Sequence, residues 1–193
     1  PFVAMERVDA RTLSIADDPA ATERMLEIAD LLAAFHGVSL ESAGFSNDVA
    51  EMPLDEHYKT VALPYWEDAW RALGSFDSFT MEWALHYLRN FPQGAGDALR
   101  LIHGDYRTRQ ILADQGKLVA LLDFELSGPG SAAEDLACIK PEAERVMPWD
   151  QFVARYEASG GVPIAVETLT YFDIFIQFRD LVVVARGQDI YER

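Results

Sequence analysis

The sequence predicts a domain of the α+β class that is mostly α-helical, with one small β-hairpin near its middle. Apolar residues recur at helical spacing over several segments, and between residues 99 and 122 the pattern changes to that of short strands. The chain has 193 residues, of which 50% are hydrophobic and 25% are charged, which is the composition of one globular domain. Four or five helices packed around one hairpin are therefore expected.

The first half of the chain contains a predicted strand, two strong helices and a loop. Residues 1–8 alternate and are rich in apolar residues, as in a strand that needs a partner. Residues 22–35 and 79–91 place apolar side chains at helical spacing and end at breaking residues. Residues 44–65 carry glycines, prolines and short polar residues with weak periodicity, which indicates a loop with at most a short helix.

The second half begins with strands and ends with helices. A short strand at 100–102 precedes the hairpin, whose strands are predicted at 110–113 and 117–122 around the turn Asp-Gln-Gly. Three further helices are predicted over residues 131–139, 149–159 and 166–186.

The charge balance and the cysteine content exclude several classes of function. With 32 acidic and 16 basic residues the net charge is −16, and this field repels nucleic acids and anionic membranes. No apolar run approaches the roughly 20 residues of a membrane span. The single cysteine, Cys138, is expected to be a small buried residue, which favours a reducing, cytoplasmic location. We expect no nucleic-acid partner and no membrane partner.

Two acidic residues lie where the hairpin region begins and ends. Asp105 follows a glycine in the short loop after an apolar strand, where a carboxylate can point into a cleft. Asp123 directly follows the apolar run Val-Ala-Leu-Leu, which is expected to be a buried strand. Their spacing resembles that of the kinase catalytic machinery, in which one Asp accepts the proton of the substrate hydroxyl and a second Asp holds Mg²⁺.

The surrounding motifs resemble those of the aminoglycoside phosphotransferase and choline kinase-like family, which has a protein kinase-like fold. His-Gly-Asp at 103–105 with Gln110, Asp-Phe-Glu at 123–125 and Asp-Leu-Ala at 135–137 follow the order of the family's H-G-D-x-x-x-x-N, D-x-E or D-x-D, and D-L-A motifs. The resemblance covers most of the chain and is strongest over 101–137. It implies a C-terminal lobe in which the small hairpin carries the catalytic loop.

The resemblance also implies a division of the chain. Residues 1–10 would cross between two lobes, where the family binds adenine through backbone groups, here at Glu6 and Val8. Residues 11–193 would form the helical C-lobe, with its catalytic loop at 101–112 and its metal-binding segment at 121–126.

An N-lobe is missing from this chain according to the same comparison. Kinase-type catalysis also needs a glycine-rich loop over the phosphates and a strand lysine paired with a helix glutamate, and the sequence offers neither. We therefore expect an N-lobe outside this chain and weak or absent catalysis by the chain alone. We also expect self-association through apolar surface that the N-lobe would cover.

Carried over residue by residue, the resemblance implies a role for each matched position. Asp105 would be the catalytic base, and Arg107 would stand near the transferred phosphate, where protein kinases carry a lysine. Gln110 and Asp123 would bind Mg²⁺. Asp135 would be the buried carboxylate that braces the catalytic loop.

Three positions are less well determined by the residues alone. Glu125 either supports the metal or caps nearby backbone. His103 is expected to support the loop structurally and not to carry a proton. Gln110 keeps the amide oxygen of the family's asparagine but adds one methylene, which displaces a ligand that octahedral Mg²⁺ holds at about 2.1 Å. The metal site is therefore expected to be weakened.

The expected function is transfer of the γ-phosphoryl group of ATP to a hydroxyl of a small molecule, with Mg²⁺ as cofactor. The alternative is a non-catalytic, kinase-like binding or scaffold domain, which Gln110 and the missing lobe favour. The substrate cannot be read from the sequence, because members of the family act on aminoglycosides, choline, sugars, amino alcohols and hydroxyacyl thioesters.

Overall fold

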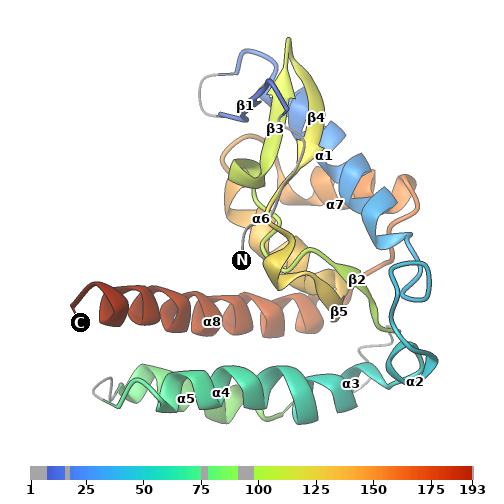
Figure 1. The fold of residues 1–193 in the computed structure, drawn as a ribbon. Coiled ribbons are helices and arrows are strands. Elements are labelled where there is room, and N and C mark those ends of the chain that lie inside the picture. The colour runs from blue at the N-terminus through green and yellow to red at the C-terminus, as the bar shows by residue number, and fades with distance from the viewer. Residues whose placement is uncertain (1–7, 16–17, 75–77, 91–97, 193) are drawn as a thin grey trace.

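The computed structural model describes residues 8–15, 18–74, 78–90 and 98–192, with the side chains of the last helix described up to residue 187. The α+β class and the mostly helical character are confirmed (Figure 1). The helices are α1 (Ala21–His36), α2 (Asn47–Ala50), α3 (Leu54–His57), the π turn η1 (Tyr58–Ala62), α4 (Leu63–Arg71), α5 (Phe79–Leu88), α6 (Ala132–Ala143), α7 (Trp149–Ala158) and α8 (Val166–Glu192), with 3₁₀ turns η2 (Thr108–Gln110) and η3 (Phe124–Leu126). The strands are β1 (Arg11–Thr12), β2 (Arg100–Ile102), β3 (Ile111–Asp114), β4 (Lys117–Leu121) and β5 (Gly128–Gly130).

Two small antiparallel sheets contain the strands on either side of residues 103–110. The predicted hairpin is confirmed as β3 and β4, and β1 adds a third strand beside β3, with Thr12 opposite Leu112. The strand predicted over residues 1–8 lies outside the described residues except for Val8, which is exposed and belongs to no strand. The second sheet pairs β2 with β5, which was not predicted because Gly-Pro-Gly lacks the composition of a strand.

The prediction of a loop over residues 44–65 is wrong from Leu54 onward, where α3, η1 and α4 form one continuous helical run. The buried apolar side chains of this run are Leu54, Tyr58, Leu63, Trp66 and Trp70. They are four, five, three and four residues apart, and the step of five falls within the π turn. The extra residue in that turn breaks the regular spacing of apolar residues by which a helix is recognised in a sequence, because each α-helical turn takes only 3.6 residues.

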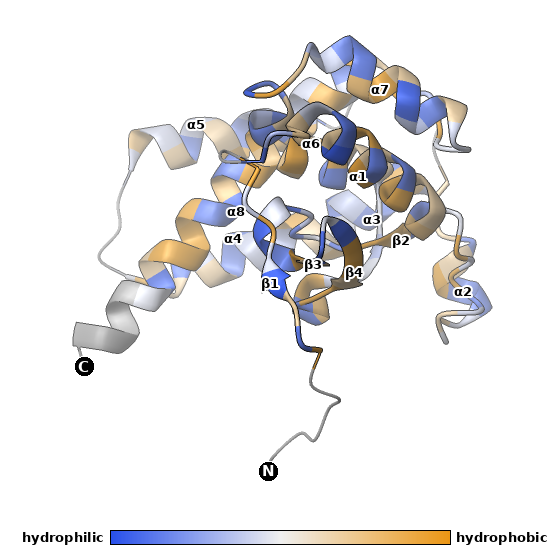
Figure 2. Ribbon diagram, turned by 90° about the horizontal axis from the view of Figure 1, so that it is seen from above, coloured by the Kyte–Doolittle hydropathy of each residue, from blue (hydrophilic) through white to orange (hydrophobic). Residues whose placement is uncertain are grey.

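Helix α6 lies between two hydrophobic clusters. Ala133 and Ala137, one turn apart, belong to the cluster that joins α3, α4, α5 and α8. Leu136, Ile139 and Ala143 lie on another face and belong to the cluster that joins α1, α7 and the hairpin. Figure 1 shows these two groups of elements on opposite sides of α6, and Figure 2 shows hydrophobic and hydrophilic residues along α7, which belongs to one of these groups. Burial on both faces fixes α6 relative to the rest of the molecule.

Serine side chains begin two of the helices. Ser78 Oγ accepts the N–H of Met81 at 3.4 Å at the start of α5, and Ser131 Oγ accepts the N–H of Ala133 at 3.2 Å at the start of α6. Such caps satisfy backbone donors that the helix itself leaves unpaired. The cap of α6 matters for the site, because Asp135 lies in its first turns.

Among the described residues, no helix combines the length and the apolar character that a membrane span requires.

Candidate active site

The loop that follows β2 is held by a buried carboxylate of α6. Asp135 has no exposed surface, and its Oδ2 accepts the N–H of His103 at 2.7 Å while its Oδ1 accepts the N–H of Gly104 at 2.8 Å. His36 Nε2 lies 3.1 Å from the same Oδ2. A buried carboxylate needs such partners, and these hydrogen bonds fix the two peptides that precede Asp105.

Gly104 is required in this loop for two reasons. Its φ is +82°, which side chains with a Cβ rarely adopt. A Cβ at this position would lie 2.4 Å from the carbonyl oxygen of Leu126, and that oxygen belongs to backbone that cannot swing away. The loop therefore passes directly against η3.

His103 connects the loop to the strand that precedes Asp123. Its ring is buried, with Nε2 2.8 Å from the carbonyl oxygen of Leu122 and Nδ1 3.2 Å from the backbone nitrogen of Asp105. The carbonyl can only accept and the backbone N–H can only donate, so Nε2 carries the proton and Nδ1 is free of one. The ring thus ties together two segments of the site.

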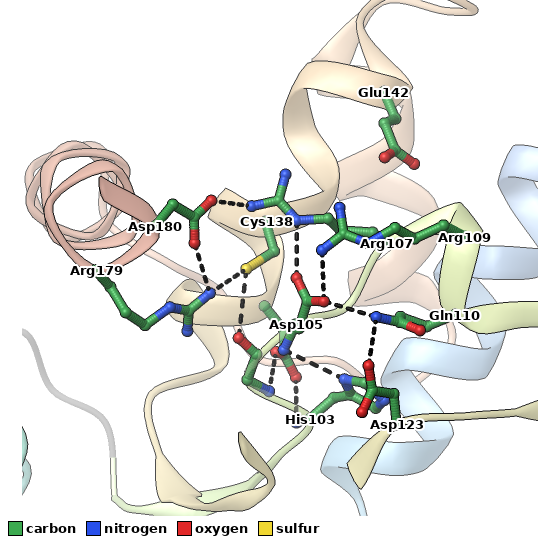
Figure 3. A network of polar contacts seen from close by, with 12 residues as sticks. His103, Asp105, Arg107, Arg109, Gln110, Asp123, Cys138, Glu142, Arg179 and Asp180 are labelled. Carbon is green, nitrogen blue, oxygen red and sulfur yellow. Dashed lines mark hydrogen bonds and ion pairs between the residues drawn. The ribbon is translucent and has the colours of Figure 1, made fainter. Parts of the chain in front are cut away.

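Asp105 lies at the centre of a network of donors (Figure 3). Its Oδ1 accepts from Arg107 Nε at 2.8 Å, and its Oδ2 accepts from Arg109 Nη2 at 2.6 Å and from Gln110 Nε2 at 2.7 Å. Burial by itself raises the pKa of Asp105, but the hydrogen bonds from Gln110 and Arg107 and the charges of the two arginines outweigh it and lower the pKa below its usual value. The carboxylate is therefore ionised at neutral pH and can accept a proton.

Asp123 reaches the same place from the end of β4. Its backbone is left-handed, with φ +65° and ψ +60°, which is unusual for a residue other than glycine and is often found at functional sites. Gln110 Nε2 donates to Asp123 Oδ2 at 3.0 Å as well as to Asp105. One amide nitrogen thus joins the two carboxylates that the sequence singled out, although they lie eighteen residues apart in the chain.

The side chains here that could offer oxygen atoms to a magnesium ion are Asp123 and Gln110, whose amide nitrogen faces the two carboxylates. Within the described part of the chain, no three His, Cys, Asp or Glu side chains gather closely enough to hold a metal ion by themselves. Mg²⁺ commonly takes only one or two protein oxygens and completes its shell with water and phosphate oxygens. The exposed carboxylate of Asp123 and the amide oxygen of Gln110 are oxygen ligands of this kind.

The remaining predicted site residues are less closely connected to this network. Glu125 lies in η3, two residues beyond Asp123, with its side chain exposed. Val8 is exposed and lies before β1. Glu6 lies outside the described residues.

A second polar network, which the sequence did not reveal, lies behind the loop. Glu134 accepts hydrogen bonds from the hydroxyl of Tyr58 and from Arg179 Nη1, the latter at 2.8 Å, and Arg179 Nη2 lies 3.5 Å from Cys138 Sγ. Burial raises the pKa of Glu134 to about 7, with the charge of Arg179 acting against it. The sequence feature that could have indicated this network is Arg179, at the end of the largely apolar segment Phe-Ile-Gln-Phe-Arg of α8. An arginine buried with such a segment requires a partner for its charge.

A cavity of about 750 Å³ lies beside the loop but does not include the paired carboxylates. It is bordered by residues 12–15, the first turn of α1, Thr108 and the end of α6. The N–H of Thr108 donates to Glu142 Oε2 at 2.8 Å across its wall. The cavity therefore borders the loop at Thr108 and does not reach Asp123.

Comparisons with known proteins agree with this arrangement. A model of the "Phosphotransferase enzyme family" matches residues 1–169. No curated protein sequence matches the chain. A solved structure from Ralstonia eutropha, assigned as an aminoglycoside phosphotransferase, superposes with a TM-score of 0.73 at 21% identity, over 94% of this chain and 61% of that one.

Two further structures show the same fold. A macrolide 2′-phosphotransferase from Brachybacterium faecium has a TM-score of 0.64 at 16% identity, over 93% of this chain and 62% of that one. A choline kinase from Cryptosporidium parvum has a TM-score of 0.61 at 14% identity, over 93% of this chain and 60% of that one. The chain thus spans about three fifths of the length of these structures. Together with the matched motifs and the family model, which covers most of the sequence, this shows that the chain belongs to the phosphotransferase enzyme family.

Proposed function

We propose that the protein to which this chain belongs transfers the γ-phosphoryl group of ATP to a hydroxyl of a small molecule. The observation that carries the proposal is the amide of Gln110, which donates to Asp105 at 2.7 Å and to Asp123 at 3.0 Å. The residues proposed as proton acceptor and metal ligand therefore lie side by side, which supports phosphoryl transfer. Membership of the family supports the reaction class.

Each residue of the network has a role in this proposal. Asp105 orients the acceptor hydroxyl and takes its proton as the hydroxyl oxygen bonds to the γ-phosphorus and the bond from that phosphorus to the oxygen of the departing ADP breaks. Arg107 and Arg109 provide positive charge beside the transferred group. Asp123 and Gln110 would hold Mg²⁺, which when bound neutralises charge on the phosphate oxygens. Asp135 and His103 keep the loop in place while these groups act.

An N-lobe and the adenine contacts at Glu6 and Val8 remain part of the proposal. Support for an N-lobe comes from exposed apolar side chains at the end of β4 and in η3, where Leu122 is 37% and Phe124 48% exposed. A covering lobe would bury them, and the chain alone would self-associate through them. The buried free thiol of Cys138 is consistent with the proposed cytoplasmic location.

A second candidate function is a non-catalytic, kinase-like binding or scaffold domain. The observation that favours it is the same amide of Gln110, whose nitrogen lies between two carboxylates and satisfies both without a cation. If the longer side chain keeps this position, metal binding is weakened. ATP hydrolysis that depends on Mg²⁺, measured with the complete protein, separates the two candidates.

Calorimetric titration of Mg·ATP into the 193-residue chain tests the nucleotide half-site. We expect binding that depends on the metal and is lost in Asp123→Asn, because the amide that replaces the carboxylate lacks its charge. Asp114→Asn is the matched control, since Asp114 is an exposed aspartate at the tip of the same hairpin. Equal binding by both variants would show that Asp123 is not a metal ligand.

Replacing Asp105 by Asn in the complete protein tests the catalytic assignment. We expect turnover with a hydroxyl acceptor to fall by a factor of about 10² or more while nucleotide binding changes little, because the isosteric amide cannot take the proton of the hydroxyl. Unchanged turnover would contradict the role of Asp105.

A further inference from the structure

Carboxylates from two distant parts of the chain hold the guanidinium of Arg107. Its Nε donates to Asp105 Oδ1 at 2.8 Å, and its Nη2 donates to Oδ2 of Asp180 on α8 (Figure 3). The side chain of Arg107 is only 15% exposed. Two separate anchors fix both the position and the rotation of a planar guanidinium, whereas one anchor leaves it free to pivot.

Asp180 is itself fixed by the residue before it. Arg179 is buried and donates through Nη2 to Asp180 Oδ1 at 3.4 Å, while its Nη1 donates to Glu134 on α6. The contacts therefore run from α6 through α8 to the loop. The family model ends at residue 169, so Asp180 lies beyond the region that the family motifs cover.

We propose that Asp180 is a positioning residue that holds Arg107 beside Asp105 and thereby makes α8 part of the active site. Its effect on catalysis depends on the proposed function, whereas its effect on the position of Arg107 does not. A cation that meets a transferred phosphoryl group is most effective when it is already in place, because no reorganisation is then needed during the reaction.

The competing explanation is that Asp180 only helps to pack α8 against the domain. Asp173 provides a matched control for this explanation, because it lies on the same helix and forms an ion pair of 2.7 Å with Lys140 on α6. Its exposure is similar, at 30% against 41% for Asp180. It has no described contact with Arg107.

Solvent exchange of the Arg107 Nε–H, followed by ¹⁵N-edited NMR in the 193-residue chain, tests the positioning directly. We expect Asp180→Asn to raise the exchange rate about tenfold, because the guanidinium loses a charged anchor. Asp180→Glu should restore most of the protection, and Asp173→Asn should leave the rate unchanged. Equal rates in Asp180→Asn and Asp173→Asn would overturn the proposal. So would an Asp180→Asn chain that circular dichroism shows to be unfolded while Asp173→Asn is folded.

Kinetics of the complete protein test the catalytic consequence. We expect Asp180→Asn to lower kcat by a factor of about 10 to 100 while the KM for ATP stays the same, because misplacing a catalytic group by an ångström has effects of that size. An unchanged kcat, in a protein whose Asp105→Asn variant is inactive, would overturn the role of Asp180 and leave the proposed function intact. Failure of the proposed function would instead appear as the absence of Mg²⁺-dependent phosphoryl transfer by the complete protein without any substitution.

Discussion

The carboxylate of Asp135 accepts two backbone hydrogen bonds at a fully buried position, which few other side chains could do. Both oxygens accept backbone N–H groups, and no part of the residue is exposed. An amide in the same place would offer one acceptor and turn a donor toward a donor. The residue is therefore expected to be intolerant of even an isosteric change.

Asp135→Asn is expected to lower the free energy of unfolding by about 2–3 kcal/mol, because a buried backbone donor is left unpaired. Urea denaturation followed by circular dichroism measures the change. Asp68→Asn, an exposed position on α4, serves as the control and should change stability by less than about 0.5 kcal/mol. Equal effects of the two substitutions would show that the bracing contacts contribute little.

Glu134 gives the stability a dependence on pH. Burial raises its pKa from 4.5 to about 7, so between these values the folded chain holds a proton that the unfolded chain releases. Protonated Glu134 therefore contributes to the stability of the folded chain below pH 4.5, and this contribution is lost as the pH rises through 7. We expect wild type to lose roughly 3 kcal/mol relative to Glu134→Gln between pH 4.5 and pH 7.5. Parallel pH profiles of the two proteins would contradict this assignment.

At the scale of elements, the loop and η3 depend on each other through Gly104. Gly104→Ala introduces a Cβ that clashes with backbone and forces a positive φ on alanine. We expect it to lower stability by about 2–4 kcal/mol, as thermal or urea denaturation would show. Gly128→Ala is the control, because its Cβ would meet open space and its φ is not positive, so it should cost less than 1 kcal/mol, about the range of an ordinary surface change.

The π turn is expected to make the helical run from α3 to α4 tolerant of the deletion of one residue. Deleting Thr60, which is exposed, would leave the five buried apolar residues four, four, three and four positions apart, which is the spacing of a regular helix. We expect this deletion to preserve the fold and to change stability by no more than about 1 kcal/mol. Deleting Asp68 from the regular turn of α4 should cost more than about 3 kcal/mol, because Trp70 rotates out of the core. Urea denaturation of both variants provides the comparison.

The elements that could be predicted are those whose period is regular over their whole length. The hairpin was predictable because its alternation flanks an Asp-Gln-Gly turn, and α8 because its aromatic residues recur at helical spacing. The π turn interrupts such a period, and β5 forms only because β2 supplies its partner. The motifs that resemble the family's singled out Asp105, Gln110 and Asp123, which the structure joins by hydrogen bonds. Asp180 could not be predicted in this way, because it reaches Arg107 from 73 residues away with no fixed spacing.

At the scale of the whole molecule, α6 unites two cores. Its faces are buried in the cluster of α3, α4, α5 and α8 and in the cluster of α1, α7 and the hairpin. Neither cluster can lose its packing without exposing one face of this helix, so the two are expected to unfold together as one cooperative unit.

The position of Asp135 on this shared helix has a consequence for hydrogen exchange. The N–H groups of His103 and Gly104 bond to a carboxylate whose helix is buried on two faces, so releasing them requires the opening of both cores. These two loop amides should exchange with deuterium only when the whole chain unfolds, as amides in the middle of a central helix do. A loop of this kind offers no low-energy opening of its own, and its geometry persists for as long as the domain is folded.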